Sequence, residues 1–452
     1  MAFKLKASWP VLYTALFILF IAEAFTRSRG LLVTEGVLVI LCLAVSLPSA
    51  RMMFRVISLL FLAAGIGCVL WSGGGITLLL ENMSSNVMLF SLLYALPFIN
   101  RVIVVGGYGR QLSRWVNARS SNMGHLFARS AIVSYVLSLF LFLASIPLVY
   151  FVLDKHFHNM NSGVKKRFMS MSILRSFGAI GLWSPVEPIV AMASLLTGAA
   201  YFQLLPAMLG ISLFLLAASA VLGYFRFRSI PLKEEPAAPD RLPDISKFFS
   251  LFAGLTLLIA SAYGLQSLLK LSFFEAMTLV IIPFSYLWAA ALRRLGRFAA
   301  ASRAQWKPSL SGLPNLLVLF LSFGFFNKAV AATPLLVRVA DSIQGIAHTP
   351  ALLFLFILAV CLPLPILGVH PYVIMGLFGV VLQPIMDEIN PVAVAVVLIT
   401  SCAASAVMGT YNTTVTIMSG LIHVNPYRIT WWNAGFGLLF GLAGFAAGLL
   451  LL

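Results

Sequence analysis

Charge is scarce in this chain, and negative charge is the scarcer kind. Only 10% of the 452 residues are charged, and the 13 acidic residues are outnumbered by 30 lysines and arginines. Hydrophobic residues make up 61% of the sequence, more than a soluble protein of this length could bury. The composition therefore excludes a soluble globular protein and predicts an all-α polytopic membrane protein of the plasma (inner) membrane.

Cysteine is also rare, and every cysteine lies in an apolar run without the spacing of metal ligands. The four residues are Cys42, Cys68, Cys361 and Cys402. We expect them to be small buried side chains, with neither a disulfide nor a metal site. No cleavage site of small residues follows the first apolar run, so we interpret residues 1–27 as a retained extra transmembrane helix.

Apolar runs predict about 11 transmembrane helices and two shorter paired elements, which we interpret as re-entrant hairpins. The first copy of an internal repeat is expected at 28–224, with a hairpin at 128–153 and a broken helix at 169–200. Prolines and charges of both signs then predict a solvated cytoplasmic linker at 225–247.

The second copy is expected at 248–452, with its hairpin at 350–380 and its broken helix at 393–424. Asn100 matches Asn327, and Pro147 matches Pro371, at nearly the same offset along the chain. Weak identity that recurs at one offset indicates an internal repeat.

Equivalent loops carry different charge, which predicts that the two copies are inverted in the membrane. Residues 293–307 are rich in arginine and lysine, whereas the corresponding residues 66–80 contain no basic residue. Residues 154–175 are likewise basic, and their counterpart at 384–390 carries only Asp387 and Glu388. The positive-inside rule then places the amino terminus in the cytoplasm and the carboxyl terminus outside. The exceptions are Arg27, Arg29, Lys270, Lys328 and Arg338.

Two predicted spans are interrupted by residues that do not suit a membrane helix. The first stops at Gly181 and resumes from Ile189, with Glu187 between two prolines in the gap. The second is interrupted over 409–414. Proline removes a backbone donor and an intramembrane charge is costly, so such breaks need a reason. Matching discontinuous helices in two halves point to a transporter binding site.

Polar residues at the breaks and hairpin tips are the candidates for substrate binding, because half-helix ends offer backbone donors to anions. They are Ser145, Ser184, His370, Asn412, Thr413 and Thr414. Glu187 is the candidate ion-coupling residue, since burial favours the protonated form of a carboxylate, and Glu275 is a second one. The alternatives are a solvated loop for Glu187, and backbone bonding or packing for the others.

Glu23 and Glu35 lie near predicted span ends, where we expect them to be solvated. Asp154, His156 and His158 resemble a metal set by residue type, but they lie in a basic segment and we do not expect them to bind a metal.

This layout resembles the ion transporter superfamily, and most of all the divalent anion:sodium symporters and their arsenite and sodium/proton antiporter relatives. The symporters carry Ser-Asn-Thr at each hairpin tip, where those residues help to hold sodium and substrate carboxylates. The first tip here retains Ser145, and the second reads Gly-Val-His-Pro at 368–371. The resemblance implies inverted repeats and transport of an anion coupled to sodium. Protonation of a buried Glu187 would instead replace sodium as the coupling charge.

The leading hypothesis is a secondary active transporter, not an enzyme, for a small anion or organic acid. Two alternatives stay open: the membrane subunit of a multi-component uptake system, and an integral membrane enzyme or flippase acting on lipid-linked substrates. We expect no cofactor beyond a coupling H⁺ or Na⁺. The expected partners are a small anionic substrate and the lipid bilayer, with a homodimer allowed for. Nucleic acid is not expected, because the net charge of +17 follows from basic segments between spans.

Overall fold

The computed structural model describes residues 9–109, 111, 122–155, 157, 162–230, 245–335 and 349–452. Every regular element within these ranges is a helix. Eleven helical segments are long and apolar enough to cross a membrane. The prediction of an all-α polytopic membrane protein is therefore confirmed, whereas most of the predicted linker at 225–247 lies outside the described residues.

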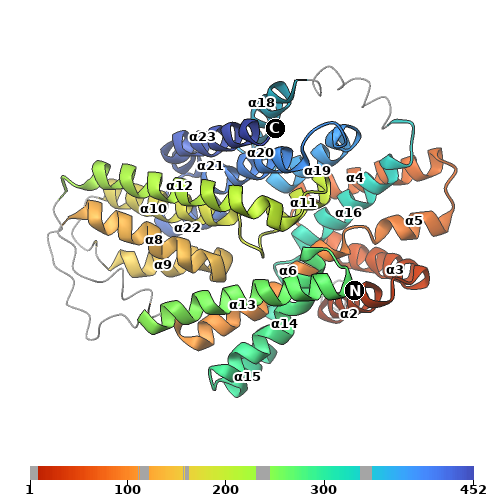
Figure 1. Ribbon diagram of the computed structural model, residues 1–452, viewed down its shortest axis with the longest axis horizontal. Coiled ribbons are helices and arrows are strands. Elements are labelled where there is room, and N and C mark those ends of the chain that lie inside the picture. The colour runs from red at the N-terminus through yellow and green to blue at the C-terminus, as the bar shows by residue number, and fades with distance from the viewer. Residues whose placement is uncertain are drawn as a thin grey trace. The chain divides into compact units, whose positions relative to one another are not determined.

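Figure 1 shows the helices that precede the linker. They are α2 (Trp9–Thr26), α3 (Arg29–Ser46), α4 (Met52–Trp71), α5 (Ile76–Met83), α6 (Val87–Gly106), α8 (Met123–Leu141), α9 (Ser145–Asp154), α10 (Ser162–Gly181), α11 (Pro188–Thr197) and α12 (Tyr201–Phe227). Short 3-10 turns add η1 (Leu47–Ser49) and η2 (Phe142–Ala144).

The helices after the linker begin at proline in several cases, because proline fixes a helical φ where no backbone donor is needed. They are α13 (Ile245–Leu269), α14 (Phe273–Ala291), α15 (Leu295–Leu310), α16 (Pro314–Ala331), α18 (Pro350–Cys361), α19 (Pro371–Leu382), α20 (Pro391–Ala403), α21 (Ser405–Met408), α22 (Thr413–Ile422) and α23 (Pro426–Leu450), with the turn η3 (Gln383–Ile385).

Two helices were not predicted. Helix α5 lies partly in the segment 66–80 and α15 in the segment 293–307, both of which were interpreted as loops. Helix α15 has no apolar run that could reveal it, because arginine, lysine and small residues dominate its sequence. The 11 candidate spans are also not the same 11 segments that the sequence predicted. They include the first hairpin, at Met123–Asp154, and not α10, which carries several basic residues.

The helices form two compact units, and the division cuts across the predicted repeats. Unit 1 comprises Met1–Val105, Leu255–Gly345 and Gly376–Met386, and it takes the opening helices of each repeat. Within it α4 packs on α16, where Gly65 faces the ring of Phe325. Helix α3 packs on α5. Unit 1 thus has its own helical core.

Unit 2 comprises Gly106–Gly254, Ile346–Met375 and Asp387–Leu452. Helices α8, α10 and α12 lie side by side in it, and α20 packs on α23 (Figure 1). Helix α8 turns through η2 into α9 and the two helices pack together, so residues 123–154 form a helical hairpin. Unit 2 therefore holds the first predicted hairpin and both predicted broken helices.

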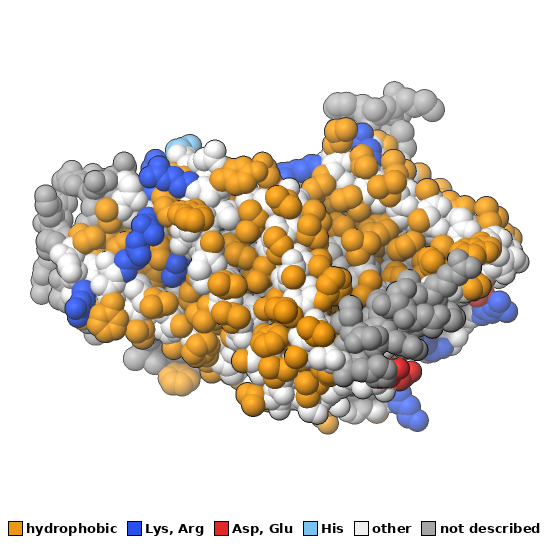
Figure 2. All heavy atoms as spheres, turned by 90° about the horizontal axis from the view of Figure 1, so that it is seen from above, with side chains coloured by type: hydrophobic (Ala, Val, Ile, Leu, Met, Phe, Trp, Pro, Cys, Tyr) orange, Lys and Arg blue, Asp and Glu red, His pale blue; other side chains and the backbone are white. Residues whose placement is uncertain are grey.

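Many large apolar side chains lie on the outside of the helices. Figure 2 shows a face on which hydrophobic side chains predominate, with lysines and arginines scattered among them. On α12, Leu213, Phe214 and Leu222 are each at least half exposed. An exposed apolar surface of this kind is typical of helices in contact with lipid.

Candidate functional site

The first break separates α10 from α11, close to where the prolines predicted it. Helix α10 ends at Gly181, and α11 begins at Pro188 after the irregular residues between them. Side chains from neighbouring helices hold this segment. The indole of Trp183 donates to the hydroxyl of Tyr135 at 2.7 Å, and the hydroxyl of Tyr201 donates to the Trp183 carbonyl at 2.8 Å. The break is thus a fixed part of the structure.

Glu187 ends this break and is only 7% exposed. The hydroxyl of Tyr372, on the first turn of α19, donates to Glu187 Oε1 at 3.4 Å. The carboxyl also lies against the backbone N–H of Ile189, at the beginning of α11. Glu187 is therefore a buried carboxyl with a tyrosine partner, and the alternative of a solvated loop residue is excluded.

Ser184 and His370 lie close to the same carboxyl. Ser184 is buried, and its carbonyl accepts the Glu187 backbone N–H at 3.1 Å. His370 is buried as well, and its Nδ1 accepts the Tyr372 backbone N–H at 3.4 Å. Both predicted substrate-binding residues thus lie within a few residues of the Glu187–Tyr372 contact.

The second break separates α21 from α22. Helix α21 ends at Met408 and α22 begins at Thr413, so the interruption lies where small and polar residues predicted it. Asn412 is the N-cap: its Oδ1 accepts the Thr414 backbone N–H at 3.2 Å, and its amide donates to Ser405 Oγ at 3.1 Å. Thr414 Oγ1 donates to the Ala406 carbonyl at 2.6 Å. Asn412 and Thr414 thus hold the break together, whereas the side chain of Thr413 is exposed.

Unit 2 brings the two breaks together. A Cβ atom on Gly178, one turn before the first break, would lie 2.4 Å from Val407, beside the second break. The segment between α18 and α19, predicted as the tip of a second hairpin, also reaches the second break, because Gly368 faces the ring of Tyr411 and Pro365 faces Gly409. The same segment leads into the helix that carries Tyr372. Segments distant in sequence therefore converge on one polar region inside an apolar unit.

Ser145 has a local role at the first hairpin tip. Its hydroxyl donates to the Phe142 carbonyl at 2.6 Å and lies 2.8 Å from Ser138 Oγ. Both bonds stay within the turn between α8 and α9, so Ser145 closes the hairpin. Helix α9, which begins at Ser145, packs on α10, which precedes the first break, and on α22, which follows the second break.

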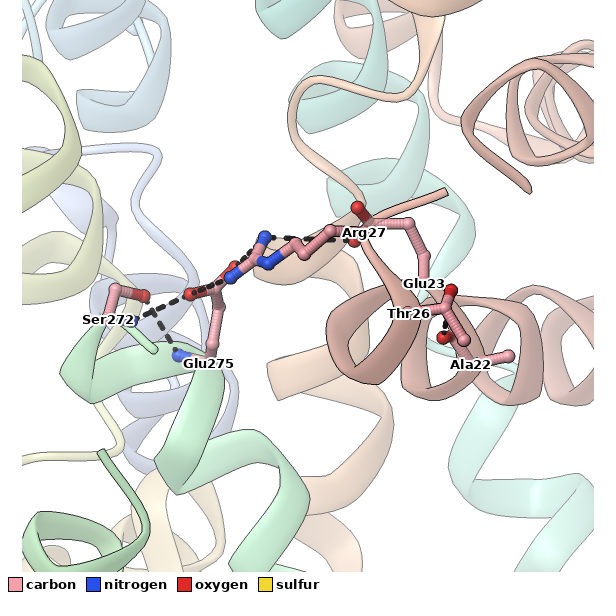
Figure 3. A network of polar contacts seen from close by, with 6 residues as sticks. All are labelled: Ala22, Glu23, Thr26, Arg27, Ser272 and Glu275. Carbon is pink, nitrogen blue, oxygen red and sulfur yellow. Dashed lines mark hydrogen bonds and ion pairs between the residues drawn. The ribbon is translucent and has the colours of Figure 1, made fainter. Parts of the chain in front are cut away.

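Glu275 belongs to unit 1, unlike the other predicted site residues, and forms part of a surface network (Figure 3). Ser272 caps α14 and exchanges hydrogen bonds with Glu275. Arg27 forms an ion pair with Glu275 at 3.2 Å and a longer one with Glu23 at 3.9 Å. These contacts give Glu275 a structural role as a helix cap, and its role in ion coupling stays a prediction.

Three interpretations of charged residues were wrong. Glu23 and Glu35 were expected to be easily solvated at span ends, but both are buried, and Glu35 Oε1 has no partner among the described residues. Arg175 was counted with a basic loop, but it lies inside α10 and is 6% exposed. Hydropathy alone did not reveal these positions, because burial depends on which helices pack around each residue.

Sequence reasoning also missed Tyr372, the partner of Glu187. Its one sequence signal is its place directly after the predicted hairpin tip, and an isolated tyrosine in an apolar run is common. No group of three potential metal ligands occurs among the described residues. Asp154 forms an ion pair with Lys165 at 2.6 Å, and the two histidines considered with it, His156 and His158, lie outside the described residues.

Comparison with solved structures finds the same fold in two membrane transporters. The YdaH transporter of Alcanivorax borkumensis, reported to have an unusual topology, matches with a TM-score of 0.58 and 14% identity over 82% of this chain and 86% of that one. MtrF of Neisseria gonorrhoeae, from a class of antimetabolite efflux pumps, matches with a TM-score of 0.54 and 13% identity over 88% of this chain and 95% of that one.

At identities this low, the likeness shows the fold alone. No protein-family model and no curated protein matches the sequence. The resemblance to the divalent anion:sodium symporters therefore stays a prediction.

Proposed function

We propose that the protein is a secondary active transporter that moves a small anion or organic acid across the membrane. The observation that carries this proposal is the pair of helix breaks that meet in unit 2, lined by Glu187, Tyr372 and His370. Broken helices expose backbone donors and acceptors that an ordinary membrane helix keeps satisfied, and they recur at transporter binding sites. The two solved structures compared above are both transporters, which supports the same interpretation.

Glu187 is the proposed coupling residue. A carboxyl removed from water favours its neutral form, so a step that opens the site to water would release the proton and a step that closes it would bind one. Tyr372 donates to the carboxyl and would hold its orientation in both states. A sodium ion is the alternative coupling ion, because a carboxylate oxygen and nearby backbone carbonyls are suitable ligands for a hard cation.

The proposed motion is alternating access of the elevator or rocking type. Unit 2 contains the first hairpin, both broken helices and the segment between α18 and α19. These elements pack on one another, so they would move as one body and carry the site with them. Motions of this kind in transporters take one structural unit past another around a site near the membrane midplane.

Transport by the purified chain in proteoliposomes tests the proposal. A panel of labelled mono- and dicarboxylates and phosphate is offered under a pH gradient alone, a sodium gradient alone, or neither. We expect at least one anion to accumulate under one of the two gradients to a higher level than without a gradient. Protein-free liposomes are the control.

If no anion accumulates under either gradient, the result contradicts the proposal. Recovery of uptake only after a soluble extract is added would favour the multi-component uptake system. Transport by the chain alone would exclude that alternative.

A further inference from the structure

Arg175 is a buried cation in unit 2 that no described carboxylate balances. It lies inside α10 and is 6% exposed. The ion pairs among the described residues involve other cations, namely Arg27, Arg29 and Lys165. Taking an ion out of water is costly unless a partner of opposite charge compensates it. A counter-charge is therefore expected near this guanidinium.

Neutral groups orient the guanidinium. Its Nε donates to Asn433 Oδ1 at 3.1 Å, an Nη donates to the Trp432 carbonyl at 3.2 Å, and the ring of Phe436 lies 4.6 Å below it. Asn433 is fully buried, and its amide donates to Ser170 Oγ at 3.0 Å. These bonds use two of the five N–H donors of arginine and leave its charge uncompensated.

Two further arginines lie close enough to act on Arg175 electrostatically. They are Arg167, earlier on α10, and Arg226, in the last turn of α12. The Nε of Arg167 is buried and has no hydrogen-bond partner among the described residues. Arg226 is exposed and Arg167 is half-buried, so water screens part of their repulsion with Arg175, and an anion beside the buried guanidinium would reduce the rest.

The group lies beside the second break. Thr430 and Asn433 are one turn apart on the same face of α23. Thr430 Oγ1 lies 3.1 Å from Oγ1 of Thr410, which is inside the break. Asn433, which holds Arg175, therefore lies one helical turn from a threonine that contacts the second break.

We infer that Arg175, held by Asn433, binds a carboxylate or phosphate group of the transported anion beside the second break. The inference rests on the proposed function and narrows its substrate to anions with at least two oxygens on one group. A planar guanidinium offers paired N–H donors that match such a group, whereas a lysine ammonium acts as a point charge. Arg167 and Arg226 would attract the anion toward this position.

Binding to the full chain in neutral detergent tests the inference, with succinate, benzoate and inorganic phosphate as probes and uncharged succinamide as the control ligand. We expect at least one of the three anions to bind the parent protein and succinamide not to bind. Arg175→Gln should raise the Kd of that anion by about tenfold or more, because a hydrogen-bonded charge is lost. Arg175→Lys should recover part of the affinity. Arg428→Gln removes an exposed arginine of α23 and should leave the Kd unchanged.

Arg175 also braces α10 against α23, so a folding defect must be separated from a binding defect. Hydrogen–deuterium exchange on the parent protein does this: the bound anion should slow exchange in peptides covering 170–181 and 426–436. Protection confined to other segments overturns the inference, as does the absence of binding by all three anions. Binding of phosphatidylglycerol alone, lost in Arg175→Gln, also overturns it and assigns the residue to lipid.

Transport then distinguishes this inference from the proposed function. If the parent accumulates an anion and folded Arg175→Gln does so with the same KM, the inference fails and the transporter proposal stands. If binding depends on Arg175 but no gradient drives accumulation, the anion site stands and the transporter proposal fails.

Discussion

Glu187 and Asn412 occupy equivalent positions, directly before the second half of a broken helix, yet their side chains differ in what they do. The Asn412 side chain bonds within its own break, to Thr414 and Ser405. The carboxyl of Glu187 lies at the beginning of α11 and also accepts a hydrogen bond from Tyr372 on α19, 185 positions away in the sequence.

Glu187→Gln is expected to bind substrate but to lose proton-driven accumulation, because the amide mimics the protonated acid and cannot release a proton. Exchange of internal for external substrate should persist. Uptake under a pH gradient and counterflow without one are measured in the same proteoliposomes. The control is Glu388→Gln, an exposed acidic residue of unit 2. If Glu187→Gln accumulates substrate as well as the parent, the proton is carried elsewhere, with Glu275 or His370 next to be tested.

Asn412 and Thr413 were both predicted to bind substrate, and the structure shows that Asn412 is also an N-cap, which Asn412→Ala removes. Loss of the N-cap should cost about 0.5–2 kcal/mol of stability, seen as a lower melting temperature in detergent. Asn412→Asp keeps the capping oxygen but loses the amide donor to Ser405, so it should recover only part of the lost melting temperature.

Thr413 is exposed at the break, so Thr413→Ala should melt normally and weaken substrate binding by about 0.5–1.5 kcal/mol, the contribution of one hydrogen bond. The Kd of the transported anion is the measurement. An unchanged Kd would move the binding site away from this residue.

At the scale of elements, close helix packing holds the second broken helix against α23. A Cβ atom on Gly444 of α23 would lie 1.7 Å from Thr400 Oγ1 on α20. The threonine cannot turn away freely, because its hydroxyl donates to the Val396 carbonyl at 2.9 Å. Small residues at such contacts let membrane helices approach one another closely.

Gly444→Ala should therefore destabilise the protein by about 1–3 kcal/mol, since the added methyl group forces α20 and α23 apart. Gly435 on the same helix has open space around its Cβ position. Gly435→Ala should be neutral or stabilise the helix by about 0.5–1 kcal/mol, because alanine loses less backbone entropy. Thermal unfolding of both variants in detergent is the measurement, and equal melting temperatures would contradict the packing argument.

For the whole molecule, the prediction concerns which side of the membrane each segment faces. The positive-inside rule places the basic helix α15 in the cytoplasm and residues 384–390 outside. Ala300 and Asp387 are both exposed, so cysteines placed there are accessible to reagents. In a background without the four native cysteines, Ala300→Cys and Asp387→Cys should react with a membrane-impermeant maleimide from opposite sides. Labelling from the same side would contradict the inverted repeat.

The sequence by itself determined where the helices run and where two of them break. Hydropathy located most spans, since a membrane helix needs a long apolar run, and proline and glycine located the breaks near Gly181 and Gly409. These signals are local, because each depends only on residues that are neighbours along the chain. Helix α15 was missed for the same reason, since a polar helix has no such run.

Only the tertiary structure decided which side chains meet. Glu187 and Tyr372 stand 185 positions apart and Arg175 and Asn433 stand 258 apart, yet each pair shares a hydrogen bond. Burial of Arg175 likewise depends on α23 packing over α10. The hydropathy pattern along the sequence cannot predict such contacts. The free energy that forms them comes from packing whole helices together and not from the residues beside each partner.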